Sequence, residues 1–395
     1  MDRSRYLTLL ILLGMLTALM PFSIDPTLSS MPEVARTFGV EHSVAQLSLI
    51  VFFLGVAAGQ LVVGPLADRY GRRPVILTAI VVYAAAAIGA ATAADIEWLI
   101  GFRALQGLAA CAGQILPRTI IRDRFDPVDA SRLLSYVMMI HGIAPVIGPI
   151  FGAHLAVAAG WRAVYWFHLA YGGLLLVLAW TLLDESILKR NLQALSPTRI
   201  ARTYVMVIRD RVFYGHMLCG LGCFAGLFVY LTAFPAVVID HFGQSGETFG
   251  YLFSITASGW MIGNLISARL VGRMGIGRLI RIGTLGIAAS ATVVAVLPWA
   301  GVNHPATIVA PMFVYMMSFS LVVPPAQAAA LTPFPEAAGA ASSLMGFLQL
   351  CLGAAIGTLV GQFDDGSQIP MVTAIGVTGL GPLAAYWWLV RKAER

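Results

Sequence analysis

Apolar residues in this chain come in long uninterrupted runs, not in the alternation of a half-buried strand or the stripe of a surface helix. A helix needs about 20 mostly apolar residues to cross the hydrocarbon core of a bilayer. Twelve runs of roughly this length follow one another, each bounded by charged residues, Pro or Gly. The pattern therefore predicts an all-α membrane protein with twelve spanning helices. The runs cover residues 6–30, 44–66, 75–94, 97–120, 133–158, 162–183, 212–238, 247–268, 279–299, 305–331, 337–361 and 369–390.

Composition agrees with a lipid environment, since 58% of the residues are hydrophobic and only 11% are charged. A soluble domain usually carries about 25% charged residues. No small-residue cleavage site follows the first run, so we interpret it as a retained span and not as a signal peptide. The four cysteines lie inside apolar runs without His or carboxylate partners, so we expect no metal, no disulfide and no cofactor.

The net charge of +6 does not indicate a nucleic-acid partner, because the basic residues form short clusters between apolar runs. Twelve spans place both termini on one side of the membrane. Every Lys and Arg except Arg36, Arg103 and Arg162 falls on that side. By the positive-inside rule this side is cytoplasmic, which predicts a multi-pass protein of the cell inner membrane with both termini in the cytoplasm.

A basic loop after the sixth run divides the chain into an N-terminal six-helix bundle (1–184), a cytoplasmic linker (185–211) and a C-terminal six-helix bundle (212–395). The loop after the second run is weakly echoed after the eighth, where Gly272 stands in the place of Asp68. Two six-helix halves with an echoed loop are the pattern expected of a major facilitator fold.

The segment from Gly64 to Arg73, Gly-Pro-Leu-Ala-Asp-Arg-Tyr-Gly-Arg-Arg, resembles the signature loop of the major facilitator superfamily. The resemblance implies a cytoplasmic gate in which Asp68 accepts hydrogen bonds at the start of the eleventh span, near Pro335. Arg72 would pair with Asp123, and Gly64 would allow close approach of a neighbouring helix. Alternatively, these charges only mark the cytoplasmic side. The gate residues are Gly64, Asp68, Arg69, Gly71, Arg72, Arg73 and Asp123.

The fourth run contains Arg103, Gln106 and Gly107, which resemble the second motif of the same superfamily. An arginine within the membrane costs at least ~2.5 kcal/mol on insertion scales, so it should face an aqueous cavity and have a partner. The alternative is that Arg103 extends to the outer surface.

Two further motifs concern ion coupling. Small residues and prolines in the fifth run resemble the motif of the antiporter branch, which implies exchange of substrate against an ion. In the first run, Asp25 lies between Pro21 and Pro26, which implies a broken helix lining a cavity. We expect Asp25 to accept the proton and Arg103, at a similar depth, to tune it; alternatively, the helix ends at Ile24 and Asp25 lies in a loop. The fifth-run motif residues are Gly142, Pro145, Gly148, Pro149 and Gly152.

The segments 25–32, 118–123 and 160–162 resemble the Bcr/CflA drug-resistance exporters. The resemblance implies a proton-coupled antiporter, and not an enzyme, that exports small amphipathic drugs or toxic metabolites. Its partners would be substrate, protons and the lipid bilayer, and we expect a monomer.

His141 is a second candidate for proton transfer, although helix packing also explains it. The alternative function is import or uniport of a small metabolite. Aromatic or Met side chains that could line an apolar cavity, or only pack or face lipid, are Phe22, Met138, Phe224, Phe228 and Tyr315.

Overall fold

The computed structural model describes residues 3–187, 196–334, 337–363 and 366–391, and these residues contain helices and no strand. Apolar spans become helices because only a helix satisfies every backbone polar group within one segment of lipid-embedded chain. The first seven helices are α1 (Arg3–Leu28), α2 (Met31–Phe38), α3 (His42–Tyr70), α4 (Arg72–Ala91), α5 (Ile96–Arg124), α6 (Pro127–Ala159) and α7 (Trp161–Leu182). They are followed by α8 (Pro197–Ile208), α9 (Arg211–Ala236), α10 (Gly246–Met274), α11 (Ile276–Trp299), α12 (Ala306–Leu331), α13 (Ala338–Gly361) and α14 (Ile369–Ala385). Short π-helical segments, Val237–His241 and Tyr386–Val390, extend α9 and α14.

Eleven of these helices are long and apolar enough to cross a membrane. The predicted eighth span, 247–268, forms α10, whose 29 residues exceed the required length. Its apolar character is diluted by Ser254, Thr256, Ser258 and Asn264. The all-α membrane fold is confirmed, and α2 and α8 are the short helices between spans.

The chain divides by its internal contacts into two units, Met1–Pro197 and Thr198–Arg395. Part of the predicted linker 185–211 is helical, as α8, and its residues 188–195 lie outside the described part of the chain. The amphipathic sequence of α8, with its buried Val207, explains this helix in a segment that charge alone marks as a loop.

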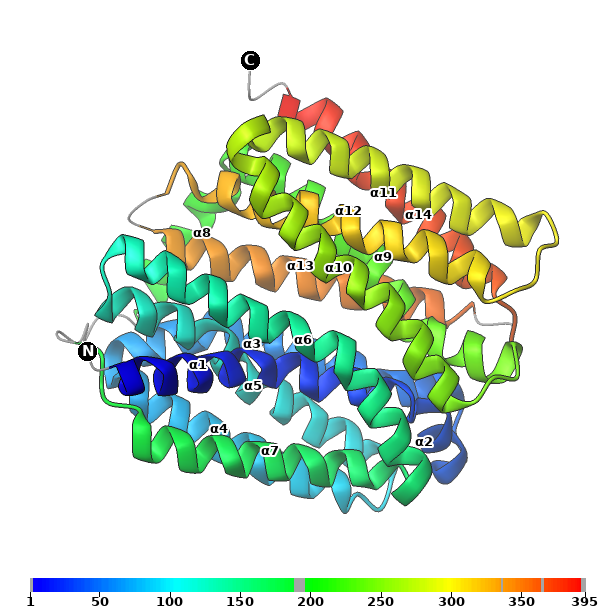
Figure 1. Ribbon diagram of the computed structural model, residues 1–395, viewed down its shortest axis with the longest axis horizontal. Helices are drawn as coiled ribbons and strands as arrows, with labels where there is room; N and C mark the ends of the chain where they lie inside the picture. Colours follow the sequence, from blue (N-terminus) through cyan, green and yellow to red (C-terminus); the bar gives the residue numbers. More distant parts are fainter. Residues whose placement is uncertain (1–2, 188–195, 335–336, 364–365, 392–395) are drawn as a thin grey trace. The chain divides into compact units, whose positions relative to one another are not determined.

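In the first unit, α3 packs along α5, α1 along α6, and α4 between α5 and α7 (Figure 1). The contact of α3 with α5 depends on small residues, because a Cβ on Gly107 would collide with the backbone carbonyl of Phe52. A Cβ on Gly59 would likewise lie 2.6 Å from the Cβ of Cys111. A Cβ on Gly64 would meet no atom within 4 Å, so the close helix contact that we expected at Gly64 is not observed in the first unit.

In the second unit, α12 packs against α9, α10 and α11, and α14 packs against α9 and α11. Aromatic rings fill the space between α9 and α10. The ring centroids of Tyr230 and Phe234 are 4.4 Å apart, and those of Tyr230 and Phe253 are 5.7 Å apart. This interior is built from stacked aromatic rings, which bury a large apolar surface.

Candidate functional site

Arg103 is held entirely inside the first unit, with no exposed surface. Its Nη1 donates to the backbone carbonyl of Ser23, at 3.0 Å, and to Gln106 Oε1, at 2.7 Å. The guanidinium carbon lies 4.3 Å from the centroid of the Phe52 ring, the distance of a cation–π contact. The side chain therefore does not extend to the surface, and its contacts join α5 to α1 and α3.

The polar contacts of Arg103 continue into a buried cluster that the sequence did not reveal. Gln106 Nε2 lies 3.3 Å from His168 Nδ1 of α7, and Ser23 Oγ lies 2.7 Å from the Tyr83 hydroxyl of α4. Ser23, Tyr83 and His168 are single polar residues within apolar runs, and nothing in their spacing indicates that they meet. The available signal was polarity itself, because a polar side chain within a span usually faces the protein interior.

Asp25 lies within α1 and is 5% exposed, so the alternative that places it in a loop after Ile24 is wrong. A Cβ on Gly148 of α6 would lie 3.0 Å from the Asp25 Cβ, and a Cβ on Gly152 would collide with Pro26. The small residues of the fifth-run motif thus let α6 lie directly against Asp25. The Asp25 Oδ2 atom is buried and, within the described residues, has no hydrogen-bond partner.

Asp25 and Arg103 do not form an ion pair in the described structure. Asp25 is part of α1, and Arg103 of α5 reaches the same turn of α1 at the backbone carbonyl of Ser23. Arg103 binds the carbonyl of Ser23, whereas Asp25 faces α6. The expected partner of Arg103 is therefore replaced by Gln106 and a backbone carbonyl. Pro145 and Pro149 lie within α6, which continues through both.

The cytoplasmic gate motif forms a network of charges around Arg72, which is buried. Arg72 Nη1 lies 2.6 Å from Asp68 Oδ1, and Arg72 Nε donates to Asp123 Oδ2 at 3.2 Å. Asp68 itself is 44% exposed. Arg69 and Arg73 contact aromatic rings instead, those of Tyr70 and Trp180. The amide groups near Pro335 that we expected to donate to Asp68 lie outside the described residues.

Glu185 completes this network, although we had assigned it only to the linker. Its carboxylate accepts hydrogen bonds from the backbone amides of Arg72 and Arg73, at 3.0 and 3.3 Å, at the start of α4. It also accepts from the amides of Ser186 and Ile187. Gly71, with φ +110°, has no room for a side chain because a Cβ there would collide with Glu185 Oε2. A carboxylate at a helix N-terminus is stabilised by the free amides and by the helix dipole.

The pKa of Glu185 reflects two opposing effects. Partial burial raises the pKa of the carboxyl, but the hydrogen bonds from the four backbone amides outweigh burial and hold its pKa below the usual value. Glu185 is therefore ionised at neutral pH and keeps the start of the linker on the gate motif.

The five candidate cavity residues differ in burial and in the side chains they contact. Phe228 and Tyr315 are fully buried within the second unit, and the Tyr315 hydroxyl donates to the backbone carbonyl of Cys223 at 2.9 Å. Phe22, Met138 and Phe224 are half-buried. Phe22 packs against the ring of Tyr171, at 5.3 Å between centroids, and Phe224 against that of Phe319, at 5.1 Å.

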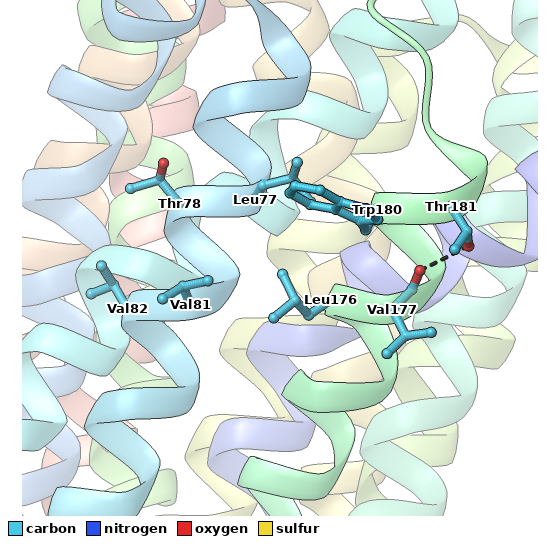
Figure 2. A pocket seen from close by; sticks show the side chains of 8 residues that line it. All are labelled: Leu77, Thr78, Val81, Val82, Leu176, Val177, Trp180 and Thr181. Carbon is cyan, nitrogen blue, oxygen red and sulfur yellow. Dashed lines mark hydrogen bonds between the residues drawn. The ribbon is translucent and has the colours of Figure 1, made fainter.

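A groove elsewhere on the first unit runs between α4 and α7 (Figure 2). None of the five candidate residues lines it, and its lining contains no titratable side chain. Exposed Val81, Val177 and Trp180 are suited to contact with lipid. The groove is lined by Leu77, Thr78, Val81, Val82, Leu176, Val177, Trp180 and Thr181.

The motifs predict a buried arginine in the fourth span, small residues that allow close helix contact in the fifth, and a charged network at the loop joining the second and third spans. The structure has all three features. Residues 10–358 match the family model described as Major Facilitator Superfamily. The chain belongs to this superfamily.

Relatives within the superfamily agree along nearly the whole chain. The chain is 32% identical to the "uncharacterized MFS-type transporter YdgK" of Bacillus subtilis, over 98% of this chain and 96% of that protein. It is 28% identical to the "bicyclomycin resistance protein homolog" of Haemophilus influenzae, over 96% and 95%. The fold is similar to that of the xylose transporter XylE from E. coli, with a TM-score of 0.77, 16% identity and 98% of each chain covered. This major facilitator protein is therefore a multi-pass membrane transporter of a small molecule.

Proposed function

We propose that this transporter is a proton-coupled antiporter that exports small amphipathic compounds from the cytoplasm. The observation that carries the proposal is Asp25, a carboxyl group buried in a span with its Oδ2 unpartnered in the described structure. A carboxyl group that costs this much to bury is expected to have a function. The relative named for bicyclomycin resistance and the fifth-run motif support export by exchange.

In the proposed cycle, substrate and proton compete for Asp25. Opening toward the outside wets the carboxylate and admits a proton, which neutralises it and weakens its hold on a cationic or polar substrate. Opening toward the cytoplasm releases the proton and restores the carboxylate for the next substrate. The Arg103 guanidinium does not lose its proton, so it remains a constant positive charge throughout the cycle.

The proposal includes an orientation with both termini and the gate motif in the cytoplasm, supported by the distribution of basic residues. Reporter fusions after residues 40, 95 and 302 should report the outer side, and fusions after 70, 200 and 395 the cytoplasm. A cytoplasmic signal at 302 would contradict the twelve-span topology.

The decisive experiment is uptake of a fluorescent amphipathic dye or a phenicol antibiotic into inverted membrane vesicles with an imposed proton gradient. Wild-type protein should concentrate the compound inside the vesicle, and Asp25→Asn should abolish this accumulation while remaining folded in the membrane. Asp95→Asn is the matched control, because Asp95 caps the N-terminus of α5 at Trp98 and Asn caps equally well.

Three outcomes would overturn the proposal. Accumulation by Asp25→Asn against a gradient would place the coupling site elsewhere. Loss of substrate from energised vesicles would indicate an importer, and transport unaffected by collapse of the proton gradient would indicate a uniporter.

A further inference from the structure

The two prolines of α1 each leave a backbone carbonyl without its normal helical partner. Proline has no N–H, so the carbonyl four residues before it loses its hydrogen bond. Pro21 releases the carbonyl of Thr17 in this way, and Pro26 releases that of Phe22. An imidazole from a neighbouring helix lies against each freed carbonyl.

The contacts of these two histidines differ. His141 of α6 has its Nδ1 2.9 Å from the Thr17 carbonyl oxygen. A carbonyl only accepts, so this nitrogen carries a proton. The Phe22 carbonyl faces the imidazole of His168 from α7. His168 Nε2 is nevertheless buried and has, among the described residues, no hydrogen bond of good geometry.

The direction of the hydrogen bonds fixes the protonation state of His168. The Arg103 guanidinium can only donate, so Gln106 turns its Oε1 toward Arg103 Nη1. The amide nitrogen of Gln106 then donates to His168 Nδ1, which must be unprotonated. The imidazole is therefore neutral with its proton on Nε2.

We propose that His168 is a second proton-carrying residue and that Gln106 converts its protonation into the release of Arg103. The inference rests on the proposed proton-coupled function and adds a residue to the same site. A proton arriving from water binds Nδ1 of the neutral ring, which becomes a cation with two N–H donors. The amide nitrogen of Gln106 now faces another donor, so the amide must invert and present Oε1 to His168.

Inversion of the Gln106 amide breaks the contact with Arg103. The amide nitrogen of Gln106 then faces Arg103 Nη1, and two donors cannot bond. Arg103 already has Nε and Nη2 buried without partners in the described structure, and Asp25 Oδ2 is unpartnered as well. Arg103 then keeps the carbonyl of Ser23 as its hydrogen-bond acceptor, and Asp25, two residues further along α1, becomes the buried carboxyl toward which the guanidinium can turn. The proton on His168 controls the charge next to the substrate–proton site.

The ionisable side chains around His168 are compatible with protonation of its ring. The Tyr83 ring of α4 lies 6.4 Å from the imidazole, and the Tyr165 ring of α7 lies 5.5 Å from it. Arg103 of α5 is the third ionisable group that faces His168. Among the described residues, the hydrogen-bond, ring and charge interactions of His168 involve no titratable side chain of α1 or α6. Tyrosine remains neutral at working pH, with a pKa of about 10 when unperturbed, so Arg103 is the charge that opposes protonation.

The tautomer gives a test that does not depend on transport. In protein labelled with ¹⁵N-histidine, the His168 resonances, assigned by their loss in His168→Gln, should show the Nε2–H tautomer at alkaline pH. His141, assigned with His141→Gln, should show the Nδ1–H tautomer instead. An Nδ1–H tautomer at His168 would overturn the proposal, even if the Gln variant does not fold well enough for transport.

Proton counting tests the coupling. Purified protein is first equilibrated at a pH low enough to protonate both Asp25 and His168. Adding saturating substrate in the presence of a pH dye and little buffer should then release about two protons from the wild type and about one from His168→Gln. His154→Gln, an exposed histidine of α6, should behave as wild type. Undiminished release by His168→Gln would overturn this inference and leave the proposed function standing. Undiminished release by Asp25→Asn would instead contradict the proposed function.

Discussion

The two units of this transporter differ in what they bury. Of the described charged side chains, the buried ones are Asp25, Arg72 and Arg103, and all three are in the first unit. The buried polar residues of the second unit are hydroxyls, amides and His216. Most of its hydroxyls bond their own helix, as Thr232 does with the carbonyl of Phe228 and Ser254 with that of Gly250.

This difference separates two kinds of interior. Hydroxyls bonded within their own helix are satisfied whatever the neighbouring helices do. Buried charges depend on partners from several helices and leave atoms unsatisfied when those partners move. We therefore expect the first unit to contain the proton-dependent steps, and the second unit to provide a uniform apolar and aromatic interior.

Arg103→Ala is expected to have the largest effect. The substitution leaves the buried Gln106 Oε1 without its donor, which costs about 1–3 kcal/mol, and empties the space beside Phe52. Proton-driven efflux should be lost and the apparent Tm lowered, measured by transport in vesicles and by thermal unfolding in detergent.

The variant Arg103→Lys should recover only part of the activity, because an ammonium cannot reproduce the planar contacts of the guanidinium. Arg281→Ala in the second unit is the matched control. Arg281 lies over the Trp387 ring at 5.4 Å, so its loss removes an arginine–aromatic contact outside the buried cluster. An equal loss of coupling in Arg281→Ala would remove the contrast between the units.

Asp68→Asn should reduce transport roughly tenfold without preventing insertion, because the charge and hydrogen-bond contribution is on the order of 1–2 kcal/mol. The ion pair with Arg72 is lost, and Asn keeps the size of the side chain. The second unit offers a direct comparison, since Gly272 occupies the corresponding place in its weak repeat.

Addition of Gly272→Asp to the Asp68→Asn variant should not restore transport at matched expression. A Cβ at Gly272 would meet no atom within 4 Å, so the new side chain would fit, but it would lack the network around Arg72. Recovery of transport by the double variant would mean that the two loops are interchangeable.

Glu185→Gln should reduce transport several-fold and expose the chain after α7 to limited proteolysis. Because the amides hold the pKa of Glu185 below its usual value, its stabilising contribution is complete above the unfolded pKa and is lost as pH falls through the folded pKa. Wild-type protection should therefore persist from neutral pH down to about 4.5 and disappear only below it. Asp184→Asn, a change at an exposed neighbour, should keep full protection.

The helices were predictable because the bilayer imposes a length and an apolar composition on each of them. The distribution of Lys and Arg then predicted which loops face the cytoplasm, and the reporter fusions test this prediction. The α8 helix was not predicted, since a short amphipathic helix in a basic loop does not resemble a span. The predicted eighth span is helical, as α10, but it is not among the eleven helices that are apolar enough to cross a membrane, so its place in the bilayer stays a prediction.

The site was only partly predictable, because motifs show which residues matter and not which residues they contact. The pattern of the gate loop indicated Arg72 and Asp123, whose side chains meet. It did not indicate Glu185, which reaches the start of α4 from 113 positions away. The depth of Arg103 suggested Asp25 as its partner, but depth along a helix does not specify direction around it. Direction depends on packing, and packing selected Ser23 and Gln106.

Tyr315→Phe should have the smallest effect, and it tests an interaction that lies entirely within the second unit. The change removes one hydroxyl that donates to the carbonyl of Cys223, and a buried hydrogen bond of this kind contributes about 0.5–1.5 kcal/mol. Gly226 leaves room for this hydroxyl, because a Cβ at that position would collide with it. Thermal unfolding should shift down slightly, while the pH dependence of efflux remains that of the wild type. Within the described residues Tyr315 forms no ion pair, and its hydroxyl donates to a backbone carbonyl. A shifted pH profile in this variant would therefore show that proton-dependent steps extend into the second unit, and the proposed division between the two interiors would be wrong.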